Sequence, residues 1–217
     1  MTTGSERFRA AFARFDAANE VDPNRETADG CARPKELVYA ERLTAMLARV
    51  APEASEALRL AARCQHIERW MIPRATYPMT RAGYLQWRLR LRDHHAERAA
   101  AILRAAGYDD SSIGRVCSLL RKEALKSDAE AQTLEDVVAL VFIESYLGEF
   151  IGAHPDYGEA KFIAILQKTA RKMSARGLGH ALTLITPPAA LLPMIRRAID
   201  TAATPSEARR TRGEGPG

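Results

Sequence analysis

The sequence predicts an all-α protein, with a single helical domain of about eight helices over residues 1–203. Three observations favour this fold class. Apolar residues recur at helical spacing along almost the whole chain, no stretch alternates apolar and polar residues as a half-buried strand would, and prolines and glycines separate the periodic segments. With 217 residues, 47% of them hydrophobic, the chain can bury one sizeable core.

The first half of the chain predicts four helices, at about residues 8–19, 34–50, 52–70 and 80–106. Phe8, Phe12 and Phe15 repeat at the spacing of one helical face. Pro34 suits the first turn of the second helix, since proline there sacrifices no hydrogen bond. A loop with two prolines precedes the fourth helix, which Gly107 ends.

The second half predicts further helices separated by turn residues. Asp110 or Ser111 would cap the first of them. Thr133 and Asp136 resemble a capping box, and they would start a very apolar helix that runs to about Phe150. Two more helices are expected at about residues 157–174 and 190–201, and residues 204–217 read as a disordered C-terminal tail.

Several classes of protein are excluded at this stage. The longest uninterrupted apolar run, from Val137 to Ile143, is far shorter than the roughly 20 residues that span a bilayer, so no membrane association is expected. The N-terminus lacks the apolar core of a signal peptide. Three widely spaced cysteines, Cys31, Cys64 and Cys117, argue against a disulfide scaffold. A reduced, cytoplasmic protein is therefore the expectation.

The positive charge is concentrated in one block of the chain. Residues 63–104 contain nine arginines and three acidic residues, whereas the rest of the chain is almost balanced. Guanidinium groups bind phosphate and carboxylate with paired hydrogen bonds, and the tryptophans and tyrosines between them suit stacking on a planar group. The alternative is a solvated helix face with core tryptophans. Arg88 and Arg92 share a helix face with His95, whereas Arg90 and Arg104 do not.

Three ionisable residues fall on apolar stripes of three different predicted helices: His66, His95 and Asp136. An unpaired charge in a core costs several kcal/mol on the order-of-magnitude scale, so such groups pair or coordinate something. Two imidazoles and a carboxylate suit a divalent Zn, Mn, Fe or Co ion. Two simpler interpretations stay open, in which Asp136 caps its own helix and the histidines are satisfied within the core.

The order of these residues resembles the HD-domain superfamily of metal-dependent phosphohydrolases. AARCQHIERW stands where that family has a helix ending in a His-Asp pair, with Gln65 and His66 in the place of the pair. DHHAERAAAILRAAGY resembles the next helix, with His95 as the matching histidine, and EDVVALVFIESYL resembles the last, with Asp136 in the Asp position. Over about residues 35–150, the resemblance implies an HD-like bundle and a metal-dependent hydrolase.

Other positions depart from the HD pattern. Tyr39 or Glu41 stands in place of the first histidine, and Lys122 stands where a further histidine often follows. Residues 8–185 also resemble an uncharacterised family that is classed as a domain of unknown function. The segments that carry this second resemblance are QHIERWMIPRATYP, GYLQWR, QTLEDVVALVF and KTARKMS. This second resemblance implies membership of a family, but it does not imply any particular activity.

The first hypothesis is a divergent HD-like enzyme that hydrolyses a small phosphorylated or otherwise anionic substrate with a metal-bound hydroxide. His66, His95 and Asp136 would bind the metal, with Glu41, His94 or Glu135 completing the set. Gln65, Glu135 and Lys122 would assist catalysis. The residues expected to bind the substrate are basic or aromatic: Arg69, Arg74, Arg88, Arg92 and Trp87.

Three alternatives remain at the level of sequence. An iron-dependent oxygenase would use the same ligands with dioxygen. A non-enzymatic protein would bind a nucleotide or RNA through the arginines and aromatic residues, with an affinity that falls steeply with salt. A helical protein that self-associates would simply pair its inner polar residues, and an Asp136 bonded to His66 or His95 would be its sign. The sequence predicts neither the substrate nor the oligomeric state.

Overall fold

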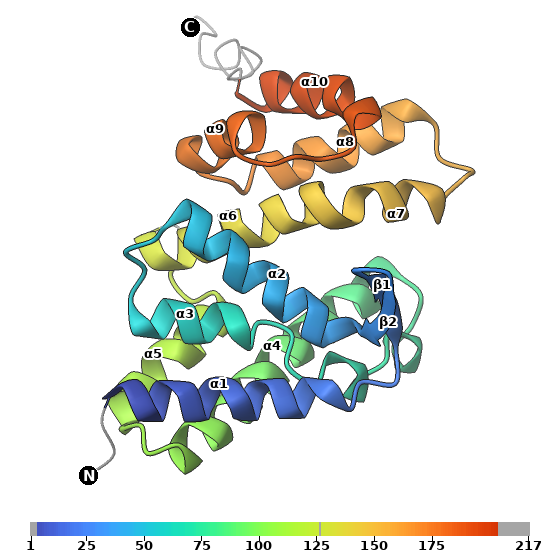
Figure 1. Cartoon of the computed structure of the whole chain (residues 1–217). Helices are drawn as coiled ribbons and strands as arrows, with labels where there is room; N and C mark the ends of the chain where they lie inside the picture. The colour runs from blue at the N-terminus through green and yellow to red at the C-terminus, as the bar shows by residue number, and fades with distance from the viewer. Residues whose placement is uncertain (1–3, 126, 204–217) are drawn as a thin grey trace, which may run out of the picture. The chain divides into compact units, whose positions relative to one another are not determined.

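The computed structural model describes residues 4–125 and 127–203 of the chain, which are predominantly helical, as the sequence predicts (Figure 1). Within these residues there are ten α-helices and one two-stranded antiparallel sheet. The described residues fall into two compact units, one up to Val137 and one from Val138 onward. The predicted disordered tail, residues 204–217, lies outside the described part of the chain.

The helices of the first unit are α1 (Gly4–Glu20), α2 (Lys35–Val50), α3 (Glu56–Arg63), α4 (Arg81–Ala105), α5 (Asp110–Arg121) and most of α6 (Ala129–Val141). Helix α3 packs against α1, α2 and α5, and α4 packs against α1 and α5. The apolar residues that recur at helical spacing on α2 are buried, and they join Phe15, Leu60 and Leu120 in the core; they are Leu37, Ala40, Leu43, Leu47 and Val50. Burial of these side chains provides the main stabilisation of this unit.

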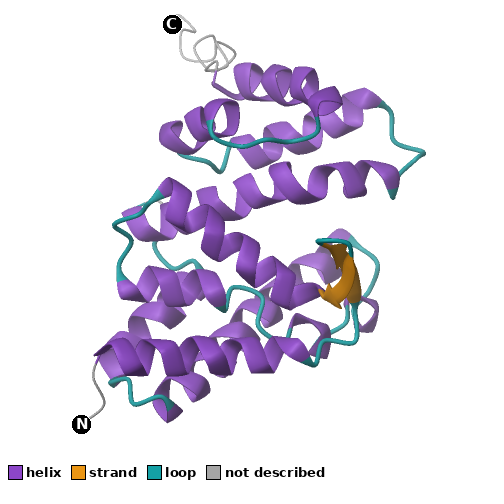
Figure 2. Cartoon of the chain, in the orientation of Figure 1, coloured by secondary structure: helices purple, strands orange, loops and turns teal. Residues whose placement is uncertain are grey.

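A short β-hairpin precedes α2, formed by β1 (Arg25–Ala28) and β2 (Cys31–Pro34) (Figure 2). The prediction that the chain has no strand is therefore wrong. Asp29 and Gly30 connect the two strands with φ angles of 52° and 77°. An Asp-Gly pair with two positive φ angles is typical of the tight turn that matches the twist of a hairpin. The strands of four residues are too short to show an alternating pattern.

Helix α3 ends at Arg63, whereas the sequence predicts a helix up to Trp70. The residues that follow form a turn, and Glu68 has a φ of 50°, which a right-handed helix cannot contain. The Glu68 carboxylate accepts a hydrogen bond from Arg98 of α4 at 2.8 Å. His66 therefore lies on a turn held against α4 rather than on a helical stripe.

The loop from Ile72 to Thr80 is fixed to the start of α4. The indole nitrogen Nε1 of Trp87 donates to the carbonyl oxygen of Ile72 at 2.8 Å. Arg74 donates to the carbonyl oxygens of Tyr77 and Pro78 at 2.9 and 2.8 Å. Gly83 permits this approach, because a Cβ atom at that position would lie only 2.2 Å from the carbonyl oxygen of Pro78.

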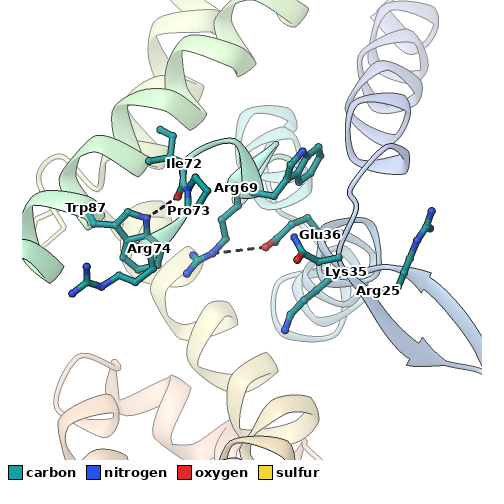
Figure 3. Close-up of a pocket in the computed structure, with 10 residues that line it drawn as sticks. Arg25, Lys35, Glu36, Arg69, Ile72, Pro73, Arg74 and Trp87 are labelled. Carbon is teal, nitrogen blue, oxygen red and sulfur yellow. Dashed lines mark hydrogen bonds and ion pairs between the residues drawn. The ribbon is translucent and has the colours of Figure 1, made fainter. Parts of the chain in front are cut away.

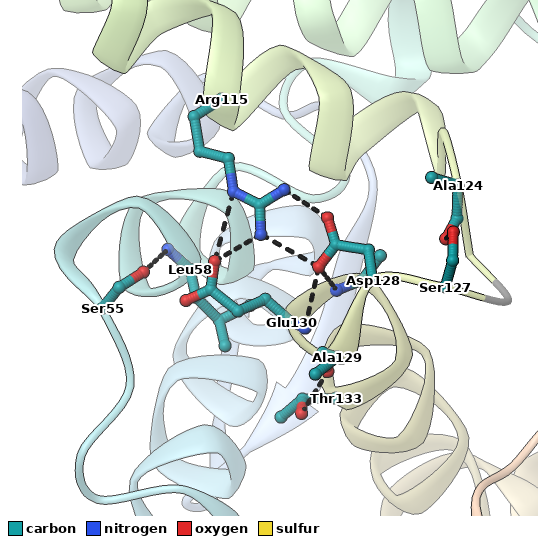
Figure 4. Close-up of polar contacts among 10 residues, drawn as sticks. Ser55, Leu58, Arg115, Ala124, Ser127, Asp128, Ala129, Glu130 and Thr133 are labelled. Carbon is teal, nitrogen blue, oxygen red and sulfur yellow. Dashed lines mark hydrogen bonds and ion pairs between the residues drawn. The ribbon is translucent and has the colours of Figure 1, made fainter.

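Arg115, Asp128 and Glu130 form a cluster, the Arg115 cluster, that joins α5 to α6 (Figure 4). The Asp128 carboxylate accepts hydrogen bonds from the backbone N–H groups of Glu130 and Ala131 at 2.9 and 3.2 Å, so it caps α6. Arg115 pairs with both carboxylates. The hydrogen bonds that Arg115 donates to Asp128 hold the pKa of this carboxyl well below its usual range, against the smaller opposing effect of burial.

The N-terminal caps predicted for two helices, α5 and α6, are wrong. The helix that contains Asp136 begins at Ala129, so Thr133 and Asp136 lie inside it and do not form its capping box. Thr133 instead donates to the carbonyl oxygen of Ala129 at 2.8 Å. Helix α5 is capped by Asp109, whose carboxylate accepts from the N–H of Ser112 at 2.8 Å, rather than by Asp110 or Ser111.

The second unit contains a π-helical segment (Phe142–Tyr146), α7 (Leu147–Gly152), α8 (Glu159–Ala170), α9 (Ala175–Thr183) and α10 (Leu192–Ala203). Helices α8 and α10 pack against each other through buried residues that include Phe162, Leu166 and Ile195. Helix α9, which Ser174 caps, lies between the two helices that the sequence predicts at about residues 157–174 and 190–201, and it was not predicted. Of the helices in residues 4–125 and 127–203, none has the length and apolar character needed to cross a membrane.

Candidate functional site

His95 is buried in α4 with one ring nitrogen unused. Its Nδ1 lies 2.8 Å from the carbonyl oxygen of Ile67. Because a carbonyl oxygen only accepts hydrogen bonds, Nδ1 carries the proton and Nε2 presents a lone pair. Nε2 is buried and has no hydrogen-bond partner among residues 4–125 and 127–203. Burial lowers the pKa of His95 to about 3, so the ring is neutral at physiological pH.

His66 lies beside His95, with 5.8 Å between the ring centroids. Its Nε2 is 3.3 Å from Nη1 of Arg69, which only donates, so the His66 proton is on Nδ1. That Nδ1 lies 3.4 Å from Oε2 of Glu36. The Tyr39 ring stacks on the imidazole at 4.3 Å. Burial, with a smaller effect of Arg69, lowers the pKa of His66 well below its usual value.

Glu36 is a member of this site that the sequence-based assignment missed. Its side chain is 10% exposed, and its Oε1 lies 3.7 Å from Nε of Arg69. Burial raises the pKa of Glu36 to about 7, against the opposing effect of Arg69. A signal for this residue exists in the sequence, because Glu36 starts the apolar stripe that continues with Ala40 and Leu43 on α2.

Two buried polar residues at the end of α1 connect the segments that carry the site. Asn19 accepts a hydrogen bond from the N–H of Glu68 at 3.0 Å and donates to the carbonyl oxygen of Glu36 at 3.4 Å. Asp22 accepts from the N–H groups of Glu36 and Asn24 at 3.0 and 2.8 Å. Asn19 and Asp22 are 1% and 0% exposed. They therefore fix the start of α2 relative to the turn that carries His66.

Cations surround the histidine pair. The positive charges of Arg69, Arg88 and Lys122 all contribute to lowering the pKa of His66. Lys122 forms an ion pair with the buried Glu135, and burial lowers the pKa of Lys122. Arg88 is half-buried in α4, yet it makes no hydrogen bond or ion pair with any residue in the described part of the chain. We call this set the histidine centre: Glu36, Tyr39, His66, Arg69, Arg88, His95, Lys122 and Glu135.

The candidate metal ligands are only partly brought together. His94 lies beside His95, with 5.7 Å between their ring centroids, and its Nε2 is buried without a hydrogen-bond partner in the described part of the chain. The carbonyl oxygen of the Gln65 side chain is also buried without one. Asp136, which is 4% exposed, accepts a hydrogen bond from Gln132 at 3.0 Å. Arg92, like Arg88, is half-buried on α4.

Glu41 lies away from the histidine pair. Its carboxylate forms two hydrogen bonds with Arg33, at 2.8 and 2.9 Å. Tyr39, two residues earlier, faces His66, and two residues turn a helix by about 200°. Glu41 therefore faces the opposite side of α2. Within residues 4–125 and 127–203, no three His, Cys, Asp or Glu side chains are grouped so as to hold a metal ion.

An open pocket of about 400 Å³ adjoins the histidine centre through Glu36 and Arg69 (Figure 3). We call it the outer pocket. Arg69 and Glu36 lie between Trp87 and Arg74 on one side and Arg25 and Lys35 on the other. The Arg69 guanidinium lies 4.8 Å from the ring centroid of Trp87. The residues that line the pocket are Asn24, Arg25, Lys35, Glu36, Arg69, Trp70, Ile72, Pro73, Arg74 and Trp87.

Of the residues assigned to substrate binding from the sequence, Arg69, Arg74 and Trp87 line the outer pocket, whereas Arg88 and Arg92 do not. Arg25 and Lys35 also line the pocket, although the sequence pattern does not mark them as candidates. These two residues lie outside the arginine-rich block, on the hairpin and at the start of α2, so composition alone does not draw attention to them.

Comparison with known proteins identifies a family. A family model described as a domain of unknown function (DUF4202) matches residues 9–195, so the chain belongs to that family. No curated protein and no solved structure has significant similarity to the chain.

Proposed function

We propose that the chain binds a small phosphorylated or otherwise anionic molecule at the histidine centre and hydrolyses it. The observation that carries the proposal is an imbalance of charge beside two neutral histidines. Lys122 is matched by Glu135 and Arg69 approaches Glu36, but Arg88 has no carboxylate partner among the described residues. A half-buried cation without a partner is costly, and an anionic ligand would supply the missing partner.

The chain's own groups have distinct roles in this proposal. Arg69 and Arg88 bind the anion, and the proton on Nδ1 of His66 faces Glu36 and keeps the ring oriented. The lone pair on Nε2 of His95 accepts a hydrogen bond from a water molecule or binds a metal ion. Perturbed pKa values that gather in one place, as for Glu36, His66 and His95, are typical of functional sites.

A metal-dependent form of this activity, in a divergent HD-like site, is favoured by one specific observation. Metal-binding histidines commonly donate their other ring nitrogen to a carbonyl oxygen, as His95 does to Ile67. His66 fits less well, because Arg69 occupies its lone pair. The order of His66, His95 and Asp136 along the chain supports the HD relationship. A bound Zn, Mn, Fe or Co ion would lower the pKa of a coordinated water to about 7.

Elemental analysis of the purified protein, before and after chelation, tests the metal-dependent form. We expect a transition metal that co-purifies and raises the melting temperature when it is added back. Iron as the main metal, with oxygen consumption, would support the oxygenase instead. If no metal binds and chelation leaves hydrolysis unchanged, the metal-dependent form is wrong and a metal-free hydrolase remains.

Hydrolysis itself is tested with a panel of small phosphorylated probes and the variant H95Q. We expect H95Q to lower turnover by about 100-fold, in the range that single acid–base or ligand residues supply. The variant H180Q, in the second unit, is the matched control and should retain full turnover. Absence of turnover for every probe, together with salt-sensitive RNA binding that H95Q leaves unchanged, would favour the nucleic-acid-binding alternative.

A further inference from the structure

Arg88 and Arg92 occupy a stripe of α4 that elsewhere faces the core. The two arginines are four residues apart, so their side chains leave the same face of the helix about 6 Å apart along its axis. Ala99 and Leu103 continue this stripe, and both are 0% exposed. Arg88 and Arg92 are half-buried at its other end. Positions that apolar side chains fill in one half of the helix are therefore filled by guanidinium groups in the other half.

Neither of these arginines has a partner in the described part of the chain. No hydrogen bond or ion pair joins them to another described residue, and Nε of Arg92 is buried without an acceptor. The adjacent acidic residue, Asp93, pairs with Arg121 at 3.4 Å instead. By contrast, the exposed Arg90 on the same helix contacts Glu97 at 3.2 Å. The two half-buried guanidinium groups, rather than the exposed one, therefore lack a counterion among the described residues.

Lys122 adds a third cation beside the two arginines. It follows α5 with a φ of 58°, a left-handed conformation that glycine or asparagine usually adopts at the end of a helix. Its side chain is 9% exposed and forms an ion pair with Glu135. Burial lowers the pKa of Lys122, and the positive charges of Arg88 and Arg92 add to this effect, so both arginines lie near the ammonium group. Glu135 balances only one of the three charges.

The unmatched charges form two adjoining positions for an anion. Arg88 lies within reach of the histidine pair, since burial and, to a smaller extent, the charge of Arg88 lower the pKa of His66 and His95. Arg92 lies within reach of Lys122, one helical turn from Arg88. One anionic group beside the histidines would leave Arg92 without a partner. A half-buried guanidinium without a partner is costly, so a second anionic group would stabilise the complex.

We propose that the histidine centre binds a diphosphate group, with one phosphoryl group at Arg88 beside His95 and the next at Arg92 and Lys122. Each phosphoryl group offers acceptor oxygens for the paired hydrogen bonds of a guanidinium group. Two linked groups supply negative charge at both positions, whereas a phosphate monoester or a carboxylate supplies it at one. This inference deepens the proposed function by naming the class of substrate, and it rests on that function for the reaction.

Calorimetric titration of inorganic phosphate and pyrophosphate into the chelator-treated full-length protein, at constant ionic strength, tests the second position without any need for turnover. We expect each ligand to bind at one site, and pyrophosphate to bind at least about tenfold more tightly, since it gains a further charge-assisted hydrogen bond. Because pyrophosphate also carries more charge than phosphate, the location of the second group is tested with variants.

The variants R92Q and R90Q form a matched pair. R92Q removes a cation that has no partner among the described residues, so it breaks no known ion pair, whereas R90Q removes an exposed cation from another face of α4. R92Q should weaken pyrophosphate binding by about tenfold and phosphate binding by less than about threefold. R90Q should bind both ligands as the wild type does. Circular dichroism confirms that each variant is folded.

The inference is overturned if the wild type binds neither ligand or binds both equally tightly, or if R92Q keeps the preference for pyrophosphate. Equal weakening of both ligands by R92Q would also contradict it, because Arg92 would then contact a single anionic group. A preference that R92Q abolishes, with no hydrolysis of any phosphorylated probe, would support the diphosphate site and contradict the proposed hydrolase. Hydrolysis of monophosphate probes that R92Q leaves unchanged, with no preference for pyrophosphate, would support the proposed function and contradict this inference.

Discussion

The Arg115 cluster and the histidine centre are both assemblies of charged side chains in the first unit, and their charges are balanced differently. In the Arg115 cluster, one guanidinium meets two carboxylates, and one of these carboxylates also caps α6 (Figure 4). In the histidine centre, Arg88 lacks a partner among the described residues, and Nε2 of His95 is buried without a hydrogen bond.

The difference separates a structural role from a binding role. A network in which every polar group is satisfied stabilises the fold and needs no ligand. A site that retains unmatched cations and an unused lone pair is less stable than it would be if apolar side chains filled it, and such sites are commonly retained for function. Substitutions at the two places should therefore have opposite effects on stability and on binding.

The largest loss of stability is expected for R115M. Both carboxylates of the cluster lose their cation, and the connection between α5 and α6 is weakened, so the free energy of unfolding should fall by about 1–3 kcal/mol. Urea denaturation measures this change, and phosphate binding should stay as in the wild type. Arg121 on the same helix has a single exposed contact with Asp93 at 3.4 Å, so R121M should cost less than about 0.5 kcal/mol. Equal losses for the two variants would contradict a structural role for the cluster.

An intermediate effect is expected for the pH dependence of stability in E36Q, measured on chelator-treated protein. The folded protein keeps a proton on Glu36 between its usual pKa of 4.5 and about 7, so this residue makes the wild type less stable as pH rises through that range. His95 has the opposite effect on stability, because its pKa is lowered from 6.5 to about 3 in the folded protein. The unfolded chain takes up a proton at this residue as pH falls below 6.5 and the folded protein does not, so His95 makes the protein more stable as pH rises through that range.

In E36Q, the decrease in stability with pH that Glu36 causes is absent, and the increase with pH that His95 causes remains. Between pH 4.5 and 7, the free energy of unfolding of E36Q should therefore rise more steeply with pH than that of the wild type, by up to about 1.4 kcal/mol per pH unit. Parallel curves for the two proteins would show that Glu36 titrates normally in the folded state.

The smallest effect on stability is expected for R88M, the counterpart of R115M at the histidine centre. Methionine replaces an unpaired half-buried cation, so the free energy of unfolding should stay constant or rise by up to about 1 kcal/mol. Hydrolysis of the phosphorylated probes should nevertheless fall, because the anion loses a contact. A destabilisation as large as that of R115M would mean that Arg88 has a structural partner.

Helical periodicity predicted the helical class and most helix positions, because burial of one face leaves a regular pattern in the sequence. It did not predict where α3 ends. The turn at Glu68 depends on contacts with Asn19 and Arg98, which lie 49 and 30 residues away in the chain. The hairpin was missed for a different reason, since its only local sign is the Asp29-Gly30 pair.

The candidate site was predictable to a similar extent. A histidine on an apolar stripe signals burial, and the structure places His66 and His95 together with 5.8 Å between their rings. Periodicity does not reveal which buried faces meet, so the sequence does not single out Glu36 and instead favours Glu41, five residues later, as a ligand candidate. Glu41 pairs with Arg33, and Asp136 accepts a hydrogen bond from Gln132. The first of these contacts is set by the fold and the second by the local geometry of α6.

The two buried residues at the end of α1 have a consequence for protein design. Asn19 and Asp22 contribute no side chain to the outer pocket, yet they hold the backbone of Glu36, Asn24 and Glu68 in place. A designer who grafts the pocket onto another helical scaffold must therefore transfer the last turn of α1 with it. Without that turn, the hairpin, the start of α2 and the His66 turn would have no common anchor, and the residues that line the pocket would no longer be held together.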